Sequence, residues 1–167
     1  MNKNIIMDWK TYTDYCYTLL GKIKQHGEKY DSIIAIMRGG YPIGLYLSNF
    51  LKIPLFVIQA QNNNYNEPER GEKRNGIEIG EVYGFGNVGK NILLIDDICD
   101  TGETITKVAN YLQEKGFIVS LVSMVKRTIN APFHFSVKYW YWALEVNDNG
   151  WVIFPYEPAP EEIANGI

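Results

Sequence analysis

Cysteine and histidine are scarce in this chain of 167 residues, which contains two of each. Cys16 and Cys99 do not have the close spacing of metal ligands or of a redox pair, so neither a zinc site nor a disulfide framework is predicted. We interpret Cys16 as a core residue and Cys99 as a small filler residue. His26 and His134 belong to no motif, and we expect them to be surface or hairpin residues rather than catalysts.

Long apolar runs and an excess of basic charge are also missing. No run approaches the length of a membrane span, and the first residues, Met1–Ile5, lack the apolar core of a signal peptide, so a cytoplasmic location is expected. The net charge of -3 disfavours a general nucleic-acid binder. A site for an anionic ligand must therefore be built locally. The length and the 46% hydrophobic content fit one domain over residues 1–167.

Apolar runs alternate with segments of helical periodicity along the chain. The runs that predict buried strands are Ser32–Met37, Leu55–Ile58, Ile92–Ile95 and Phe117–Val125. Helical periodicity covers Thr11–Gln25, the segment after Pro42 and the segment after Thr104. This alternation predicts an α/β fold with a doubly wound parallel sheet.

Two further regions depart from that alternation. Gln59–Asn91 is polar and rich in Asn, Glu and Gly, and we interpret it as a flexible lid over a site that must exclude water; a surface insertion is the alternative. Within it, Ile77–Val82 alternates and predicts a β-ribbon. Nearer the end, two aromatic-rich runs flank Asn147–Gly150, which predicts a hairpin, or a strand and its return.

The segment Asp96–Thr104 has the strongest chemical character in the chain. It holds three aspartates and two threonines within nine residues, directly after a buried strand and before a predicted helix. Such a turn sets carboxylates beside backbone N–H groups and the positive end of a helix dipole. A solvated loop is the alternative, although helix capping needs only one acceptor. The combination suits a phosphorylated, hydroxyl-bearing, metal-bound ligand.

This segment closely resembles the phosphoribosyl-diphosphate binding motif of the type I phosphoribosyltransferases. The resemblance implies that Asp96 and Asp97 face the ribose hydroxyls, directly or through water bound to Mg²⁺, which makes them candidate metal and catalytic residues. It also implies that Asp100 exchanges a proton with N7 of a base. The residues that match the cradle for the 5-phosphate are Asp100, Thr101, Gly102, Glu103 and Thr104.

Arg38-Gly39-Gly40 resembles the short loop with which this family binds pyrophosphate. Two glycines permit close backbone approach to an anion, and an arginine can bind it through two hydrogen bonds. An ordinary turn before a helix is the alternative. In the family the peptide bond that enters this loop is often cis, which corresponds to Met37–Arg38 here.

Two segments near the end resemble the base-binding residues of the 6-oxopurine enzymes. Lys126 resembles the lysine that holds O6 of the base, and a solvated strand-end lysine is the alternative. Trp151–Glu157 resembles a Trp-x-x-x-Pro-Trp segment, in which the tryptophan stacks on the purine and the carbonyl of the next residue, here Val152, contacts the group at C2. Aromatic core residues are the alternative. Tyr156 replaces the second tryptophan, and Asn64-Tyr65 stands where human-type enzymes have Ser-Tyr.

Together these resemblances predict the type I phosphoribosyltransferase fold, with a lid over about 59–91 and a small base-binding hood formed by about 127–167 and N-terminal residues. The implied activity is that of a magnesium-dependent pentosyltransferase of nucleotide salvage. It moves ribose 5-phosphate from phosphoribosyl diphosphate to guanine, xanthine or hypoxanthine and releases pyrophosphate. A homodimer or homotetramer without nucleic-acid or membrane partners is expected. A phosphoribosyltransferase for another base and a non-catalytic sensor of phosphoribosyl diphosphate are alternatives.

Overall fold

A computed structural model describes residues 4–62, 77–80 and 88–158. Most of the predicted lid, residues 63–76 and 81–87, lies outside these ranges, and so does the pair Asn64-Tyr65. The lid therefore remains a prediction.

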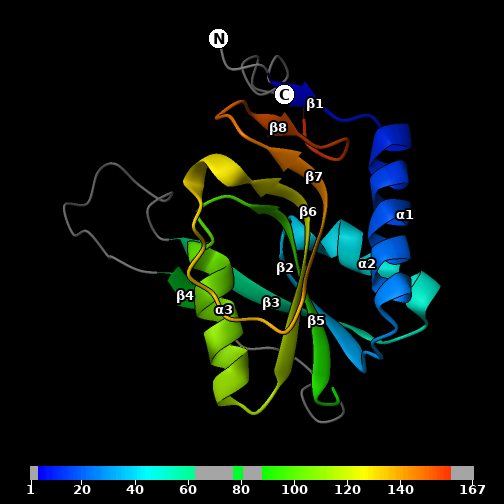
Figure 1. The fold of residues 1–167 in the computed structure, drawn as a ribbon, viewed down its shortest axis with the longest axis vertical. Helices are drawn as coiled ribbons and strands as arrows, with labels where there is room; N and C mark the ends of the chain where they lie inside the picture. The colour runs from blue at the N-terminus through cyan, green and yellow to red at the C-terminus, as the bar shows by residue number, and fades with distance from the viewer. Residues whose placement is uncertain (1–3, 63–76, 81–87, 159–167) are drawn as a thin grey trace, which may run out of the picture.

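Six strands form the main sheet in the order β4-β3-β2-β5-β6-β7 (Figure 1). Neighbouring strands are parallel except β3 and β4, which are antiparallel. The strands are β2 (Ser32–Met37), β3 (Leu55–Asn62), β4 (Ile77–Ile79), β5 (Asn91–Cys99), β6 (Ile118–Arg127) and β7 (Trp140–Val146). The predicted doubly wound sheet is confirmed, and β4 confirms the first part of the predicted ribbon.

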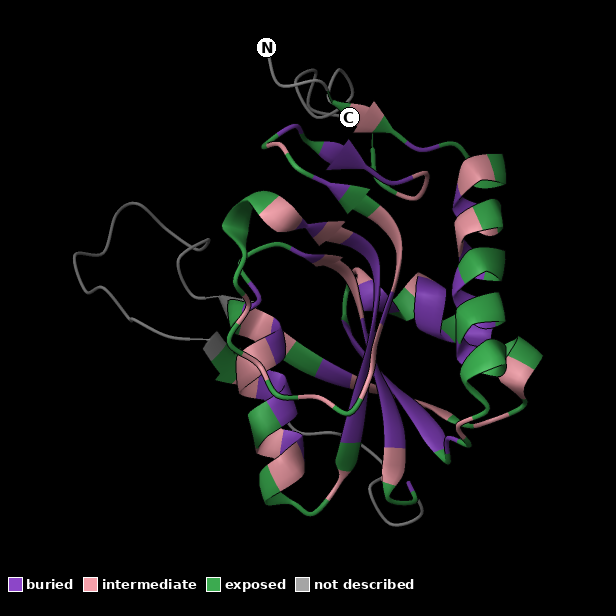
Figure 2. Ribbon diagram, in the orientation of Figure 1, coloured by how far each residue is buried: buried purple, intermediate pink, exposed green. Residues whose placement is uncertain are grey.

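Helices cover both faces of this sheet. One face carries α1 (Trp9–His26) and α2 (Gly40–Leu51), and the other carries α3 (Glu103–Glu114) (Figure 1). Because side chains alternate along a strand, Leu93 and Ile95 of β5 pack toward α1 and α2, whereas Ile92 and Leu94 pack toward α3. The central strands are accordingly buried along most of their length (Figure 2).

Local sequence explains where the first helices begin and end. The carboxylate of Asp8 accepts a hydrogen bond from the Thr11 N–H at the start of α1, and Gly27 ends the helix with φ +72°. Pro42 lies in the first turn of α2, as predicted. No helix in the described ranges is long and apolar enough to cross a membrane.

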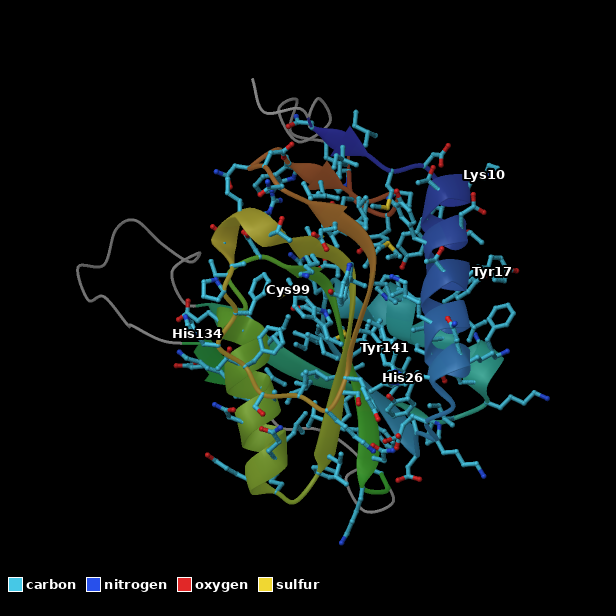
Figure 3. All side chains as sticks on the ribbon, in the orientation of Figure 1. Lys10, Tyr17, His26, Cys99, His134 and Tyr141 are labelled. Atoms are coloured by element: carbon cyan, nitrogen blue, oxygen red, sulfur yellow. The ribbon has the colours of Figure 1, made fainter. Side chains whose placement is uncertain are left out.

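The scarce residues lie where the sequence predicted. Cys16 and Cys99 are both fully buried, and burial raises the pKa of each thiol to about 12, which agrees with structural rather than reactive roles. His26 and His134 are exposed and lie on opposite sides of the molecule in Figure 3. His26 Nδ1 is 3.1 Å from the hydroxyl of Tyr141.

Of the two alternatives predicted around Asn147–Gly150, the hairpin is wrong. After β7 the chain leaves the main sheet, and β8 (Val152–Ile153) pairs in parallel with β1 (Ile5–Ile6) in a separate two-stranded sheet. The reason lies in the connection, where the guanidinium of Arg127 binds the carbonyl oxygens of Asp148 and Gly150. Those carbonyls bind a side chain rather than closing a tight two-residue turn.

Candidate active site

The candidate site lies where the order of the strands reverses. Successive connections run from β2 toward β3 in one direction and from β5 toward β6 and β7 in the other. Open α/β sheets bind ligands in the crevice outside the carboxyl ends of the strands at such a point. Arg38 follows β2, and Asp96 and Asp97 lie near the end of β5, so the fold brings the two predicted loops to the same edge.

Strand β5 is longer than the sequence predicted. Ile95 was expected to be its last residue, but it continues through both aspartates to Cys99 because β6 pairs with it to the end, with Asp96 opposite Ser123 and Cys99 opposite Lys126. On its other side the pairing with β2 stops at Ile95. The two aspartates therefore lie on a strand held from one side only.

The loop Gly39-Gly40 packs directly against this exposed side of β5. A Cβ atom added at Gly39 would overlap the carboxylate of Asp97, and one added at Gly40 would overlap the carbonyl oxygen of Ile95. Both glycines are thus required by the approach of the loop to β5, in addition to the predicted approach to an anion. The peptide bond Met37–Arg38 is cis, as the family resemblance predicted. The side chain of Arg38 is exposed.

Asp96 and Asp97 form a half-buried pair of carboxyl groups. Burial and then repulsion by Asp97 raise the pKa of Asp96 well above its usual range. Burial also raises the pKa of Asp97, although the N–H of Ile98 donates a 2.7 Å hydrogen bond that opposes the shift. Neither carboxyl forms an ion pair within the described residues. A positive charge brought by a ligand would stabilise the ionised form of both.

The donor set fits a Mg²⁺ ion that is held mainly by substrate oxygens. Two adjacent carboxyl groups with raised pKa values and no cationic partner suit a divalent cation. In the part of the chain that the structure describes, no group of three or more acidic, His or Cys residues could hold a metal by itself. This agrees with an ion that keeps several waters and binds one or two carboxylates together with phosphate oxygens.

The turn between β5 and α3 supplies backbone N–H groups. Gly102 precedes α3 with φ +76°, and its backbone lies against the rings of Phe133 and Phe135. The hydroxyl of Thr101 accepts a 3.3 Å hydrogen bond from the N–H of Glu103. The N-terminus of α3 thus follows the acidic end of β5 after a short turn, and such helix N-termini bind phosphate groups in many proteins.

Asp100 is held by residues that the sequence did not single out. Its Oδ1 lies 3.2 Å from Nε of Arg127 and accepts a hydrogen bond from Nδ2 of Asn130. Arg127 directly follows Lys126 at the end of β6. Its position next to the predicted site residue Lys126 was the one sequence signal for a role of Arg127. Its contacts with Asp100, Asp148 and Gly150 could not be predicted, because these residues are distant from it in sequence.

Lys126 does not meet Trp151 in the described structure. Its ammonium lies 4.2 Å from the ring centre of Trp142 and 5.0 Å from that of Trp140, and 3.4 Å from Oε2 of Glu145. Trp151 is 67% exposed, with its backbone N–H bonded to Asn4. The strand β7 therefore supplies aromatic neighbours of Lys126 that sequence reasoning assigned to no role.

Tyr156 connects the end of the described chain to the candidate pyrophosphate loop. Its hydroxyl donates a 3.3 Å hydrogen bond to the carbonyl of Gly39, and its ring stacks on Phe154. Burial, followed by the negative charge of Asp97, raises the pKa of this phenol. The departure from the expected tryptophan thus adds a polar contact to the loop that faces Asp97.

These features define a class of protein: a doubly wound α/β protein with a candidate site for a phosphorylated ligand at the reversal of its strand order. Comparison with known families agrees, because the phosphoribosyl transferase domain matches residues 4–159. The chain belongs to the phosphoribosyltransferase family and has the type I fold.

Relatives of known sequence cover part of the chain. The hypoxanthine/guanine phosphoribosyltransferase of Methanocella paludicola is 30% identical over 96 residues, which are 57% of this chain and 50% of the relative. The matched region of this chain thus spans about half the length of that relative.

Solved structures match almost the whole chain. A hypothetical protein from Neisseria gonorrhoeae with bound ppGpp has a TM-score of 0.77 at 22% identity, and the match covers 99% of this chain and 96% of that one. The xanthine-guanine-hypoxanthine phosphoribosyltransferase of Helicobacter pylori has a TM-score of 0.73 at 18% identity, covering 97% of this chain and 99% of that one. At these identities the likeness shows the fold.

Proposed function

We propose that this protein transfers ribose 5-phosphate from phosphoribosyl diphosphate to N9 of a 6-oxopurine base and releases pyrophosphate. The observation that carries the proposal is the packing of Gly39 against the carboxylate of Asp97, in a chain where α3 begins six residues after Asp97. This packing supports a site in which the candidate pyrophosphate loop meets the candidate hydroxyl acceptors, with the candidate phosphate cradle following in the same segment. Similarity to hypoxanthine/guanine phosphoribosyltransferases supports the choice of base class.

Each part of the donor substrate has a matching group in this arrangement. Asp96 and Asp97 accept hydrogen bonds from the ribose hydroxyls, because ionised carboxylates are acceptors only. Thr101, Thr104 and the N–H groups that begin α3 bind the 5-phosphate. Arg38 and the amides of its loop bind the pyrophosphate and stabilise the negative charge that develops as it leaves.

Metal and proton transfer complete the proposed chemistry. Asp96 and Asp97 would hold Mg²⁺, which when bound would neutralise negative charge on the diphosphate. Asp100 takes a proton from N7 of the base, which makes N9 a better nucleophile. No covalent intermediate with the protein is required.

Base recognition is assigned to the strand ends and the segment after β7. Lys126 donates a hydrogen bond to O6, Trp151 stacks on the ring, and the carbonyl of Val152 accepts from the group at C2. Adenine presents an amino donor where Lys126 also donates, so the hydrogen bond from Lys126 to the base is lost and two donors face each other. The proposed base preference therefore depends on the polarity of a single group.

The test is release of pyrophosphate from phosphoribosyl diphosphate and Mg²⁺ with guanine, xanthine, hypoxanthine and adenine. We expect turnover with at least one oxopurine and little with adenine. Lys126→Ala should weaken the use of oxopurines by about 10- to 100-fold, as expected for a charged hydrogen bond of roughly 1.5–3 kcal/mol. Trp151→Ala should weaken all accepted bases by a similar factor, because stacking contributes about 1–3 kcal/mol whatever the exocyclic groups.

Lys138→Ala is the matched control. Lys138 pairs with Glu28 at 2.8 Å, and its backbone N–H bonds to Val119 near the start of β6, away from the carboxyl edge of the sheet. Its loss should leave turnover unchanged. Efficient use of adenine with no use of oxopurines would refute the base assignment, and binding of phosphoribosyl diphosphate without turnover of any base would instead support a sensor.

A further inference from the structure

Arg127 is the buried cation of the described structure that no part of the proposed chemistry uses. Its side chain is 8% exposed. Nε lies 3.2 Å from Oδ1 of Asp100, Nη1 binds the carbonyl of Asp148, and both Nη atoms lie 3.1 Å from the carbonyl of Gly150. One guanidinium thus contacts two separate segments of the chain.

A buried guanidinium needs an opposite charge nearby and acceptors for most of its donors. Transfer of an unpaired charge out of water costs far more than one hydrogen bond returns. Asp100 supplies the opposite charge, and the two carbonyls satisfy the far end of the planar fork. Nε itself has no hydrogen-bond partner among the described residues, so Asp100 acts through its charge alone, whereas loss of the carbonyls would leave the buried Nη donors unmatched. The ion pair and these hydrogen bonds therefore connect the positions of Asp100 and of the turn before Trp151.

The two segments joined by Arg127 carry different parts of the proposed reaction. On one side Asp100 is the candidate proton acceptor for N7. On the other side the turn leads directly to Trp151 and Val152, the candidate base platform. That turn is further fixed by the N–H of Gly150, which donates a 2.7 Å hydrogen bond to Oδ1 of Asp148.

We propose that Arg127 is a positioning residue that aligns the proton acceptor Asp100 with the base-binding segment 148–152. This inference rests on the proposed function. Arg127 touches neither substrate; it sets the distance between the group that takes the proton and the surface that holds the base. A displacement of about 1 Å between such groups can cost two orders of magnitude in rate.

The test compares Arg127→Lys and Arg127→Met with the wild type in steady-state kinetics. Lysine keeps a positive charge beside Asp100 but has no planar fork to bind two carbonyls. We expect Arg127→Lys to keep kcat within about threefold while KM for the base rises about tenfold, as for loss of a charge-assisted hydrogen bond. Arg127→Met should raise KM for the base and also lower kcat by roughly 10- to 100-fold. KM for phosphoribosyl diphosphate should change less than about threefold in both.

A double-mutant cycle tests whether Arg127 acts through Asp100. Asp100→Asn should lower kcat by about a hundredfold, as loss of a positioned proton acceptor does. Adding Arg127→Met to Asp100→Asn should lower kcat no more than about threefold further, because residues that act through one contact are not additive. Independent, multiplicative losses would overturn the proposal, and so would a kcat and a base KM unchanged in both Arg127 variants.

A control variant and a fallback measurement complete the kinetic test. Lys138→Met removes a cation from an ion pair with Glu28 and should leave every parameter unchanged. If Arg127→Met does not fold, Arg127→Lys tests the proposal by itself. A rise in KM for the base with little change in kcat would support it, whereas equal losses in kcat and in both KM values would indicate a merely structural role and overturn it.

A failure of the proposed function can be distinguished from a failure of the proposed role of Arg127. If the wild type releases no pyrophosphate with any base, hydrogen exchange tests the bridge instead. In Arg127→Lys the amides of Gly150 and Trp151 should exchange at least about tenfold faster, with α1 unchanged. Unchanged exchange at these amides would overturn the proposal whatever the activity.

Discussion

Glycine decides the geometry of the candidate site at the scale of single residues. Gly39 and Gly40 let the loop after β2 lie against Asp97 and the backbone of β5, where any side chain would overlap. Gly21 has a different environment, because it lies on the exposed surface of α1 with nothing within 4 Å of an added Cβ. The same residue type is thus required in one place and replaceable in another.

We expect Gly39→Ala to lower kcat/KM for phosphoribosyl diphosphate by roughly a hundredfold. The new methyl group must displace either the loop or the Asp97 carboxylate, and displacement of reacting or binding groups by about 1 Å has effects of this size. Kinetics with varied phosphoribosyl diphosphate at saturating base measure the effect. Gly21→Ala is the control and should keep full activity; an active Gly39→Ala variant would refute the importance of the contact.

At the scale of elements, the two helices on one face of the sheet differ in how closely they approach it. A Cβ at Gly44 of α2 would lie 3.0 Å from the Cβ of Ala35 and 3.0 Å from Cδ1 of Leu55. α2 therefore lies against β2 and β3 at a distance that glycine allows. On α1, larger side chains such as Leu19 and Ile23 fill the interface.

Gly44→Ala and Gly21→Ala should change the free energy of unfolding in opposite directions. Alanine at Gly21 should stabilise the protein by about 0.5–1 kcal/mol, because alanine loses less backbone entropy in a helix. Alanine at Gly44 gains the same propensity but overpacks the interface, with a net loss of about 1–3 kcal/mol. Denaturant unfolding followed by circular dichroism measures both. Stabilisation by Gly44→Ala would show that α2 can move away from the sheet at no cost.

At the scale of the whole molecule, one sheet supports two hydrophobic clusters. β5 contributes alternate side chains to each, with Leu93 on the face of α1 and α2 and Leu94 on the face of α3, both fully buried. A strand shared in this way couples the two faces. The candidate site lies at the end of the same strand.

Leu93→Ala and Leu94→Ala should each lower the free energy of unfolding by about 2–5 kcal/mol and keep a single transition. Because β5 is common to both clusters, neither face should unfold alone. Coincident transitions in far-ultraviolet circular dichroism and tryptophan fluorescence check this. Leu45 on α2 is half-exposed, so the control Leu45→Ala should lower the free energy of unfolding by less than about 1 kcal/mol. Two separate transitions, with each variant moving only one, would contradict the shared-strand description.

The main elements and the acidic motif were predictable because their signals are local. Buried strands such as Ser32–Met37 show as uninterrupted apolar runs, and the stripe of α3 follows helical periodicity. The segment Asp96–Thr104 is contiguous, so its residue types alone indicated a site for a phosphorylated ligand. The family resemblance drawn from it agrees with the domain match over residues 4–159.

The sequence by itself determined the main strands and helices and the segments that carry charged and hydroxyl groups, because these depend on neighbouring residues. Only the tertiary structure decided which distant groups meet. It continued β5 past Ile95, paired β8 with β1, surrounded Lys126 with aromatic rings of β7, and set Arg127 between Asp100 and the turn before Trp151. These contacts are set by sheet register and by the burial of charge, which involve residues that no local pattern connects.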